Sequence, residues 1–176
     1  SLEAICQNIT IFVDSDGNVT IDPEDVDNGS GGGCTVEILT FDLSQTDFNC
    51  SDLGPNVVTL TVTDEEGNTA TCTAIITVVD NIPPAILCPP NVTVNCDEVT
   101  NPNETSQFGN ASATDNCPGV TIQEFAMFNL NNCGVGTITR TFVATDASGN
   151  TASCIQVVTF TNNNPFTEED ITWPPS

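Results

Sequence analysis

The side chains of this sequence best suited to hold a metal ion are its closely spaced carboxylates. The segment Asp14-Ser15-Asp16-Gly17-Asn18, followed by Asp22 and Asp25, spaces its side-chain oxygens much like a calcium-binding loop. Its glycine stands two places earlier than in the helix-flanked calcium loop, and strand-like segments flank it. The alternative is a plain β-turn, since Asp-Gly and Gly-Asn pairs both suit tight hairpins. Calcium contact through Asp14 and Asp16 is one prediction, and a metal-free turn is the other.

The sequence holds no recognisable arrangement for catalysis. It has no histidine, so a serine or cysteine nucleophile would lack its usual base, and no Gly-x-Ser-x-Gly turn occurs. Paired carboxylates can hydrolyse glycosides, but here nearly all of them stand in turns or linkers. Aromatic side chains that could stack on a sugar are few (nine Phe, one Trp, no Tyr), and the phenylalanines fit a core. The sequence therefore predicts a protein that is not an enzyme.

The charge balance of the chain is strongly acidic. Asp and Glu number 24 against a single basic residue, Arg140, and the formal net charge is −23. This charge excludes a nucleic-acid binder and disfavours anionic membranes, because both partners need cationic patches. No apolar run is long enough to cross a bilayer, so no membrane insertion is expected in this segment. Two explanations of the acidity stand: a well-solvated surface, or carboxylates that hold calcium as a cofactor.

The chain repeats itself, with a period of about 80 residues. Four cysteines of the first half (Cys6, Cys34, Cys50 and Cys72) recur in the second half as Cys88, Cys117, Cys133 and Cys154. A third copy begins at 171–175, which echoes 86–90. We therefore expect one module over 1–80, a second over 81–162, and a linker with the first strand of a following repeat over 163–176.

Period-two hydrophobicity indicates β-strands throughout the chain. The clearest runs, bounded by Gly, Asn, Asp or Pro, are 9–13, 57–62, 74–79, 92–94, 137–143 and 155–160. No stretch shows a helical stripe. Short strands with regular turn signals predict an all-β fold of tandem immunoglobulin-like β-sandwich modules. Pro83 and Pro84 favour a short extended connection, so we expect the modules to lie end to end.

Nine cysteines, with no CxxC pair and no histidine, indicate disulfides in place of zinc and therefore an oxidising compartment. In an immunoglobulin-like sandwich the first and last strands begin at the same end, which predicts Cys6–Cys72 and Cys88–Cys154. The cysteines between them would then close mid-domain loops as Cys34–Cys50 and Cys117–Cys133. Cys96 has no counterpart in the first repeat and is expected to carry a free thiol.

Three segments of the second repeat carry a likeness to a known family. They are Cys88-Pro89-Pro90-Asn91-Val92-Thr93-Val94, Ala113-Thr114-Asp115-Asn116-Cys117 and Ala144-Thr145-Asp146-Ala147-Ser148-Gly149-Asn150-Thr151-Ala152-Ser153-Cys154. Their counterparts in the first repeat are 13–21 and 60–68. The chain thereby resembles the hyalin-repeat-like, immunoglobulin-like tandem modules of large secreted surface adhesins of the Bacteroidota. This resemblance implies export, often by the type IX secretion route, and a role in adhesion or gliding motility.

The expected topology also predicts a second calcium site, at the seam between the modules. The turn at Asp14 would meet the turns that hold Asp115 and Asp146, with Asp80 and Asn81 running between them. Carboxylates brought together in this way repel one another, and calcium would relieve the repulsion and lock the hinge. The alternative is that Asp146, like Asp64, only caps its Gly-Asn turn through backbone hydrogen bonds.

Together these features predict a structural repeat segment of a long secreted cell-surface adhesin or filament. It would act as a disulfide-pinned, calcium-stiffened spacer that displays an adhesive tip. Its partners would be neighbouring repeats of the same chain, other copies of the fibre and the adhesive target. A self-assembling filament subunit and a carbohydrate- or protein-binding module are the alternatives.

Overall fold

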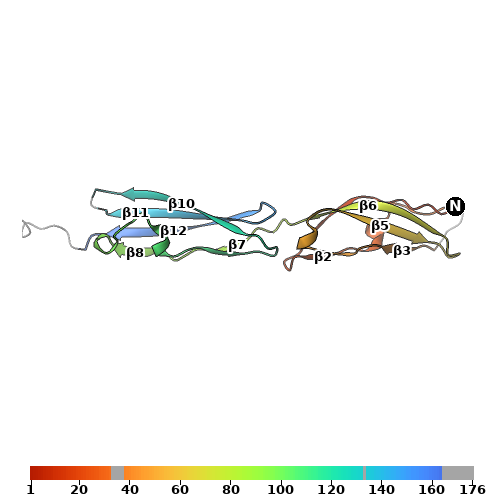
Figure 1. Ribbon diagram of the computed structural model, residues 1–176, viewed down its shortest axis with the longest axis horizontal. Helices are drawn as coiled ribbons and strands as arrows, with labels where there is room; N and C mark the ends of the chain where they lie inside the picture. Colours follow the sequence, from red (N-terminus) through yellow and green to blue (C-terminus); the bar gives the residue numbers. More distant parts are fainter. Residues whose placement is uncertain (33–37, 133, 164–176) are drawn as a thin grey trace, which may run out of the picture. The chain divides into compact units, whose positions relative to one another are not determined.

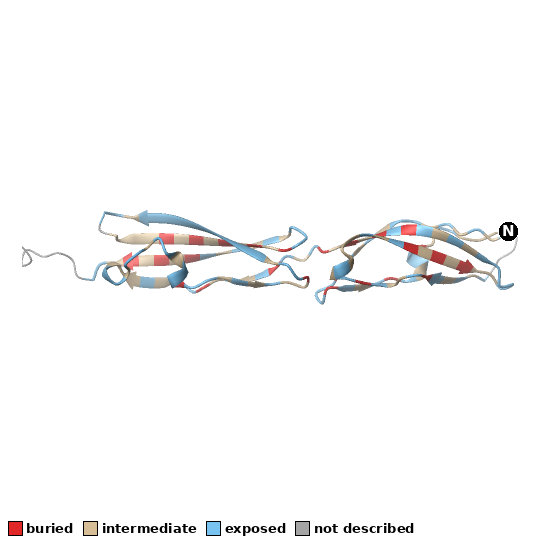
Figure 2. Ribbon diagram, in the orientation of Figure 1, coloured by how far each residue is buried: buried red, intermediate tan, exposed pale blue. Residues whose placement is uncertain are grey.

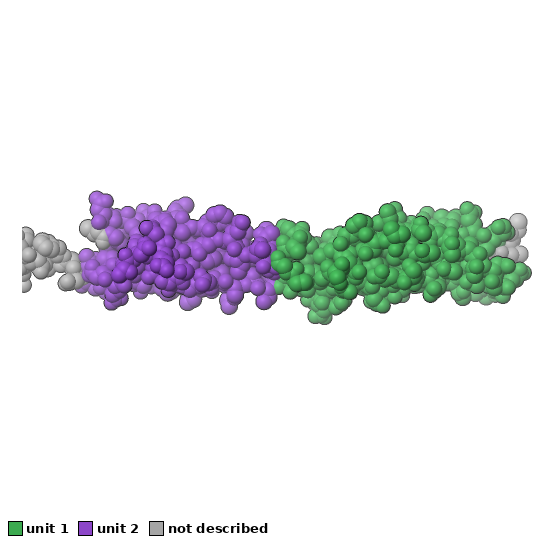
Figure 3. Space-filling view, in the orientation of Figure 1, with its two compact units in different colours: residues 1–84, 115–119, 146–150 green, residues 85–114, 120–145, 151–176 purple. Residues whose placement is uncertain are grey.

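The computed structural model describes residues 1–32, 38–132 and 134–163. In these ranges the regular structure consists of β-strands and four short 3-10 segments, so the all-β prediction is confirmed. The chain divides into two compact units, coloured separately in Figure 3. Unit 1 contains residues 1–84 together with two loops from later in the chain, 115–119 and 146–150. Unit 2 contains 85–114, 120–145 and the described residues from 151 onward.

Unit 1 is a sandwich of a four-stranded and a two-stranded sheet (Figure 1). The larger sheet has, in spatial order, β1 (Ile9–Phe12), β6 (Thr69–Val79), β5 (Gly54–Thr63) and β3 (Thr40–Leu43). The smaller sheet pairs β2 (Asn18–Thr20) with β4 (Asp47–Asn49). The first strand runs parallel to the last, with Ile9 opposite Ile76, and the other pairs are antiparallel.

Strand alternation builds the core of unit 1. Along β5 the side chains of Val58, Leu60 and Val62 are buried, and the residues between them are more exposed (Figure 2). The strand β6 repeats the pattern, because successive side chains of a strand point to opposite faces. Phe48, from the smaller sheet, is buried in the same core cluster. Each sheet thus covers the apolar face of the other.

Unit 2 repeats this architecture. Its larger sheet has the order β10 (Thr121–Leu130), β11 (Gly136–Thr145), β12 (Thr151–Thr161) and β8 (Val92–Asn95). Its smaller sheet pairs β7 (Ala85–Leu87) with β9 (Ser112–Thr114). The strand β8 again runs parallel to the last strand, β12. The fold of the chain is therefore a tandem of immunoglobulin-like β-sandwiches.

The only basic side chain of the sequence lies inside unit 2. Arg140 is fully buried, and its Nε and Nη2 donate to the two carboxylate oxygens of Glu124 at 2.8 and 3.0 Å. Its Nη1 donates to the Gly109 carbonyl at 2.8 Å, and its guanidinium carbon lies 4.8 Å from the centre of the Phe142 ring. These contacts satisfy a buried charge that would otherwise be very costly. Hydrogen bonding to Arg140 lowers the pKa of Glu124.

Four one-turn 3-10 segments connect the strands. They are η1 (Pro23–Asp25), η2 (Cys50–Asp52), η3 (Cys96–Glu98) and η4 (Thr105–Phe108). Asp22 and Asp25 cap the first of them, since the Asp22 amide donates to the Asp25 carboxylate at 3.0 Å. The Asp25 carboxylate therefore serves local structure.

Three disulfides join described residues. Cys6–Cys72 and Cys88–Cys154 are present as predicted, with 5.8 Å between the Cα atoms of each pair. The predicted Cys34–Cys50 and Cys117–Cys133 pairs are wrong, because Cys50 is bonded to Cys117. The prediction closed each repeat on itself, whereas the loop 115–119 is part of unit 1 and buries Cys117 in that core. Cys96 carries a free thiol, while Cys34, Cys133 and Trp173 lie outside the described residues.

Candidate metal centre

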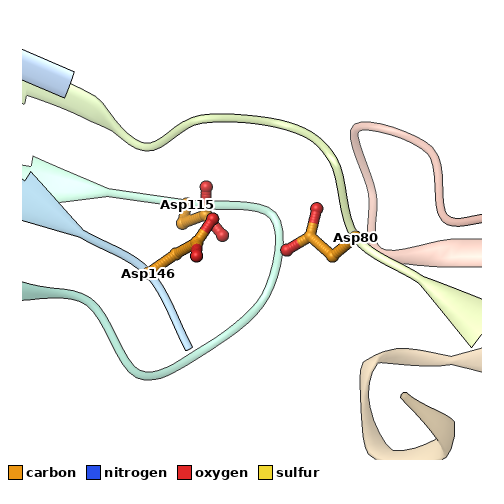
Figure 4. Close-up of side chains that lie close together, drawn as sticks. All are labelled: Asp80, Asp115 and Asp146. Carbon is orange, nitrogen blue, oxygen red and sulfur yellow. The ribbon is translucent and has the colours of Figure 1, made fainter. Parts of the chain in front are cut away.

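Three aspartates of unit 1 lie at strand ends and face one another (Figure 4). Asp80 directly follows β6, Asp115 follows β9, and Asp146 follows β11. One carboxylate oxygen from each lies within 4.8 Å of the corresponding oxygens of the other two. Asp80 and Asp146 are buried, with 3% and 6% of their surface exposed, and Asp115 is half-buried. Ionisable side chains are seldom buried to this degree without a partner.

Asp146 is held by its own turn. The backbone amide and the side-chain amide of Asn150 donate to its two carboxylate oxygens, both at 2.8 Å. The turn closes through the Gly149 amide, and Gly149 adopts a φ of +92° that favours glycine. Burial acts to raise the pKa of Asp146, but the hydrogen bonds from Asn150 and the turn amides outweigh it and lower the pKa below 3.8. The carboxylate is therefore ionised at neutral pH.

Asn116 ties the loop 115–119 to the segment that follows β6. Its side-chain amide donates to the Asp80 carboxylate at 3.2 Å and to the main-chain oxygen of Asp14 at 3.1 Å. The Asn150 side chain donates to the main-chain oxygen of Asp80 at 3.0 Å. The Cys50–Cys117 disulfide fixes the same loop covalently, one residue beyond Asn116. The three aspartates are thus held together by bonds to their neighbours and not by attraction between themselves.

Three buried oxygens at this site accept no hydrogen bond. They are Asp80 Oδ2, Asp115 Oδ1 and Asn116 Oδ1. The partner oxygens of the two carboxylates are used, since Asp80 Oδ1 accepts from the Ile82 amide and Asp115 Oδ2 accepts from the Cys117 amide, both at 3.1 Å. A buried polar atom without a partner costs about 1–3 kcal/mol. Three such atoms on residues of this one site indicate that a ligand with positive charge or donor groups belongs there.

The protein supplies no cation of its own at this site. Its one basic side chain, Arg140, is engaged with Glu124 in unit 2. Two carboxylates separated by 4.8 Å repel by about 3 kcal/mol at an effective dielectric constant of 20. The arrangement is therefore unfavourable for three ionised groups alone.

The donor set fits a hard divalent cation. All the candidate ligands are carboxylate or amide oxygens, the type that calcium prefers. Two oxygens bound to one calcium ion at its usual 2.3–2.6 Å lie no more than about 5 Å apart, which the 4.8 Å limit satisfies. Zinc is a poorer match, because the sequence has no histidine and both cysteines beside the site are oxidised. Asp80, Asp115, Asn116 and Asp146 would hold the ion.

The other predicted ligands do not bring carboxylates to this cluster. Asp14 accepts from the amides of Asp16 and Asn18 at 2.9 and 3.0 Å, and these bonds lower its pKa. Asp14 thus begins a β-turn, and its main-chain oxygen accepts from the Asn116 side chain, while calcium contact through Asp14 and Asp16 stays a prediction. Asp16 and Asn81 are exposed.

Asn116 is the site residue that the sequence analysis did not include. It stands between Asp115 and Cys117 in the segment that carries the family likeness, so its position was a usable signal. The prediction of the seam site considered only acidic residues and Asn81. An amide both donates and accepts, which lets Asn116 bind Asp80 and still present a free oxygen.

Comparison with known proteins places the second repeat in a known class. The HYR domain family matches residues 79–160. No curated protein matches the chain. The described ranges contain no helix with the length and apolar character needed to span a bilayer.

Among the solved structures that align with the chain are three multidomain extracellular segments. Immunoglobulin domains 1–4 of Sidekick-1 align with 11% identity and a TM-score of 0.43, over 92% of this chain and 48% of that one. Cadherin domains 1–4 of protocadherin gamma B7 align with 15% identity and a TM-score of 0.38, over 93% and 51%. Cadherin domains 1–3 of Drosophila N-cadherin align with 11% identity and a TM-score of 0.35, over 92% and 67%. The chain thus spans about half the length of the first two.

These likenesses are too distant to transfer a ligand or a partner. The fold of the chain follows instead from the sheet topology of each unit, and the family match concerns the second repeat. The three disulfides between described residues indicate that the protein resides in an oxidising compartment. Residues 79–160 are similar to a HYR domain, and the chain is built of immunoglobulin-like repeat modules.

Proposed function

We propose that this chain is a calcium-stiffened structural segment of a long secreted cell-surface adhesin or filament. Its modules would be 1–80 and 81–162, with 163–176 leading into a further repeat. It would act as a spacer that displays an adhesive tip away from the cell, in the manner of the Bacteroidota gliding adhesins that its motifs resemble. Its partners would be neighbouring repeats and the adhesive target.

The observation that carries the proposal is the group of unpartnered oxygens at Asp80, Asp115 and Asn116. A bound calcium ion supplies the positive charge that this group lacks. Asp115 and Asp146 directly follow β9 and β11 of unit 2, while Asp80 directly follows β6 of unit 1. An ion held by all three therefore restrains the chain segments that connect the two units. Cys50–Cys117 restrains the same loop when no ion is bound.

Repetition and cross-linking support a mechanical role. Arrays of similar modules set length and display distance, and disulfides help small domains to resist unfolding and proteolysis. The acidic surface, with a net charge of −23, also keeps such a fibre soluble.

The test combines calorimetric titration with small-angle X-ray scattering, each in calcium and in excess EGTA. We expect one calcium per chain with a Kd of about 0.1–1 mM, typical of extracellular modules. Removal of calcium should make the scattering profile that of a more flexible chain. Asp80→Asn should abolish both effects, whereas Asp64→Asn, at a turn outside the cluster, should leave them unchanged.

Two results would overturn the proposal. Absence of calcium binding at about 10 mM, well above the range of extracellular sites, would make the acidity a feature of solvation alone. Binding without any change in scattering would leave a calcium site but remove its stiffening role.

A further inference from the structure

An exposed edge strand of unit 2 differs from every other edge of the two larger sheets. The strand β10 is the outer strand of its sheet and pairs with β11 over ten successive residues without a bulge. Nine of its ten residues are exposed, as its pale blue colour in Figure 2 shows. The other edge strands of these sheets, β1, β3 and β8, have four residues each. A long edge presents a row of backbone groups that can pair with another strand.

The strand β10 carries large exposed apolar side chains on both of its faces. Phe125 and Met127 are 58% and 73% exposed and lie on the outer face, level with Thr141 and Thr139 of β11. Ile122 and Phe128 are 38% and 44% exposed, although they lie level with the buried Ala144 and Ile138. The smaller sheet of unit 2 therefore does not cover β10. Exposed apolar residues concentrated in one strand mark an interaction surface.

The strand also lacks the features that usually protect an edge. It contains no proline and no lysine, and its single charged residue, Glu124, is neutralised by Arg140. The corresponding edge of unit 1, β3, is short and carries Asp42. In a chain of net charge −23, β10 is thus an edge without an unpaired charge that exposes several apolar side chains.

We propose that β10 pairs antiparallel with β10 of a second copy of this chain, so that the two larger sheets of unit 2 join into one. Charge permits this occupant, and the self-complementary pattern of the strand favours it. Two acidic chains repel across most surfaces, but two β10 edges bring together no uncompensated carboxylate. A two-fold axis through Phe125 places Ile122 opposite Phe128 of the second copy and Glu124 opposite Ala126. Glu124 therefore never meets its own copy, and the contact is self-complementary.

The inference concerns lateral association between chains and does not depend on the calcium site. Sedimentation velocity of the full chain, from about 10 µM to about 1 mM, should show a monomer–dimer equilibrium. Dimerisation should strengthen between about 0.15 M and about 1 M salt, because salt screens the repulsion between the acidic chains. Amide hydrogen exchange should slow in β10 as the concentration rises.

Two lysine substitutions at the same level of the sheet test whether dimerisation uses the edge strand or the face of the sheet. Phe125 and Ile155 both lie level with Thr141, on the same face, and are 58% and 59% exposed. Phe125→Lys, on the edge strand, should weaken dimerisation at least about tenfold. Ile155→Lys, on the interior strand β12, should leave it within about twofold. Circular dichroism and thermal unfolding of both variants should match the parent.

Three outcomes would overturn the inference. The full chain could stay monomeric at about 1 mM in high salt. Both lysine variants could weaken the dimer equally, which would place the contact on the sheet face. Protection from exchange could arise outside β10, which would place it elsewhere on the molecule.

Discussion

Two turns of unit 1 have the same local structure and different surroundings. Asp64 and Asp146 each begin a turn that ends at an asparagine, Asn68 or Asn150. In both turns the asparagine amide donates to Oδ1 of the aspartate at 2.8 Å, and its side chain donates to Oδ2 at 2.9 or 2.8 Å. The pKa of Asp64, like that of Asp146, is lowered, mainly by the Asn68 side chain. Yet Asp64 is not part of the acidic cluster, whereas Asp146 lies beside Asp80 and Asp115.

The comparison shows that a turn motif determines its own hydrogen bonds but not its function. The bonds that hold Asp64 and Asp146 are local, and five residues encode each set. Tertiary contacts bring Asp80 and Asp115 close to Asp146. The Asn116 side chain and the Cys50–Cys117 disulfide make these contacts. The first repeat has Gly32-Gly33 where the second has Asp115-Asn116, so it encodes no equivalent set of ligands.

The largest expected effect comes from removing either disulfide of unit 1. Cys50–Cys117 and Cys6–Cys72 close loops of nearly equal length, with sequence separations of 67 and 66. Replacing either pair by alanine should lower the free energy of unfolding by about 4 kcal/mol. Only Cys50→Ala with Cys117→Ala should also weaken calcium binding, because this pair holds the loop that carries Asp115. Urea unfolding and calorimetric titration measure the two effects. An equal loss of calcium affinity in both double variants would show that Asp115 is positioned by global stability alone.

The second prediction exchanges the aspartates of the two turns for asparagine. In calcium at 100 times its Kd, Asp146→Asn should lose most of an ion-linked stabilisation of about 2.7 kcal/mol. In EGTA the same change removes repulsion from Asp80 and Asp115, so it should destabilise far less than in calcium. Asp64→Asn should have the same effect in both conditions. Thermal unfolding of each variant, with calcium and with EGTA, makes the comparison. A calcium-dependent effect of Asp64→Asn would contradict the assignment of the site.

The sequence predicted the strands and turns better than the site. Period-two runs such as 57–62 and 74–79 became the central strands β5 and β6, because alternation reports directly on burial. Two predicted disulfides, Cys6–Cys72 and Cys88–Cys154, are present because they follow from strand order. The strand β10 was not predicted, since a segment exposed on both faces shows no alternation of burial.

The predicted metal ligands also differ according to whether they were inferred from strand order or from local spacing. Asp80, Asp115 and Asp146 were expected to converge from the order of strands, and they lie together. Asp14 and Asp16 were proposed from local spacing; they lie outside this cluster, and the Asp14 carboxylate accepts from the amides of its own turn. Pairing of the middle cysteines failed because it assumed that each repeat is a closed unit. Contacts that cross from one sequence repeat to another leave no periodic signal in either.

A third prediction concerns acid unfolding in EGTA. The folded-state pKa of Asp146 lies below its ordinary value of 3.8, so the unfolded chain takes up protons first as the pH falls. Its stabilisation is present above about pH 4 and is lost as the pH falls through the lowered pKa. The same holds for Asp64. Asp146→Asn and Asp64→Asn should each flatten the fall in unfolding free energy below about pH 4, measured by urea unfolding. A fall as steep as in the parent would show that these turns are not the acid-sensitive groups.

The smallest effect tests whether the two turns are equivalent when the metal is absent. Gly67 and Gly149 have φ values of +82° and +92°, and a Cβ added at either would meet no atom within 4 Å. Substitution by alanine therefore costs only the backbone strain, about 1 kcal/mol at each position in EGTA. In calcium, Gly149→Ala should cost slightly more than Gly67→Ala, because strain in the 146–150 turn displaces a ligand. Equal costs in calcium would mean that the ion does not depend on the position of Asp146, and its coordination would then rest on Asp80, Asp115 and Asn116.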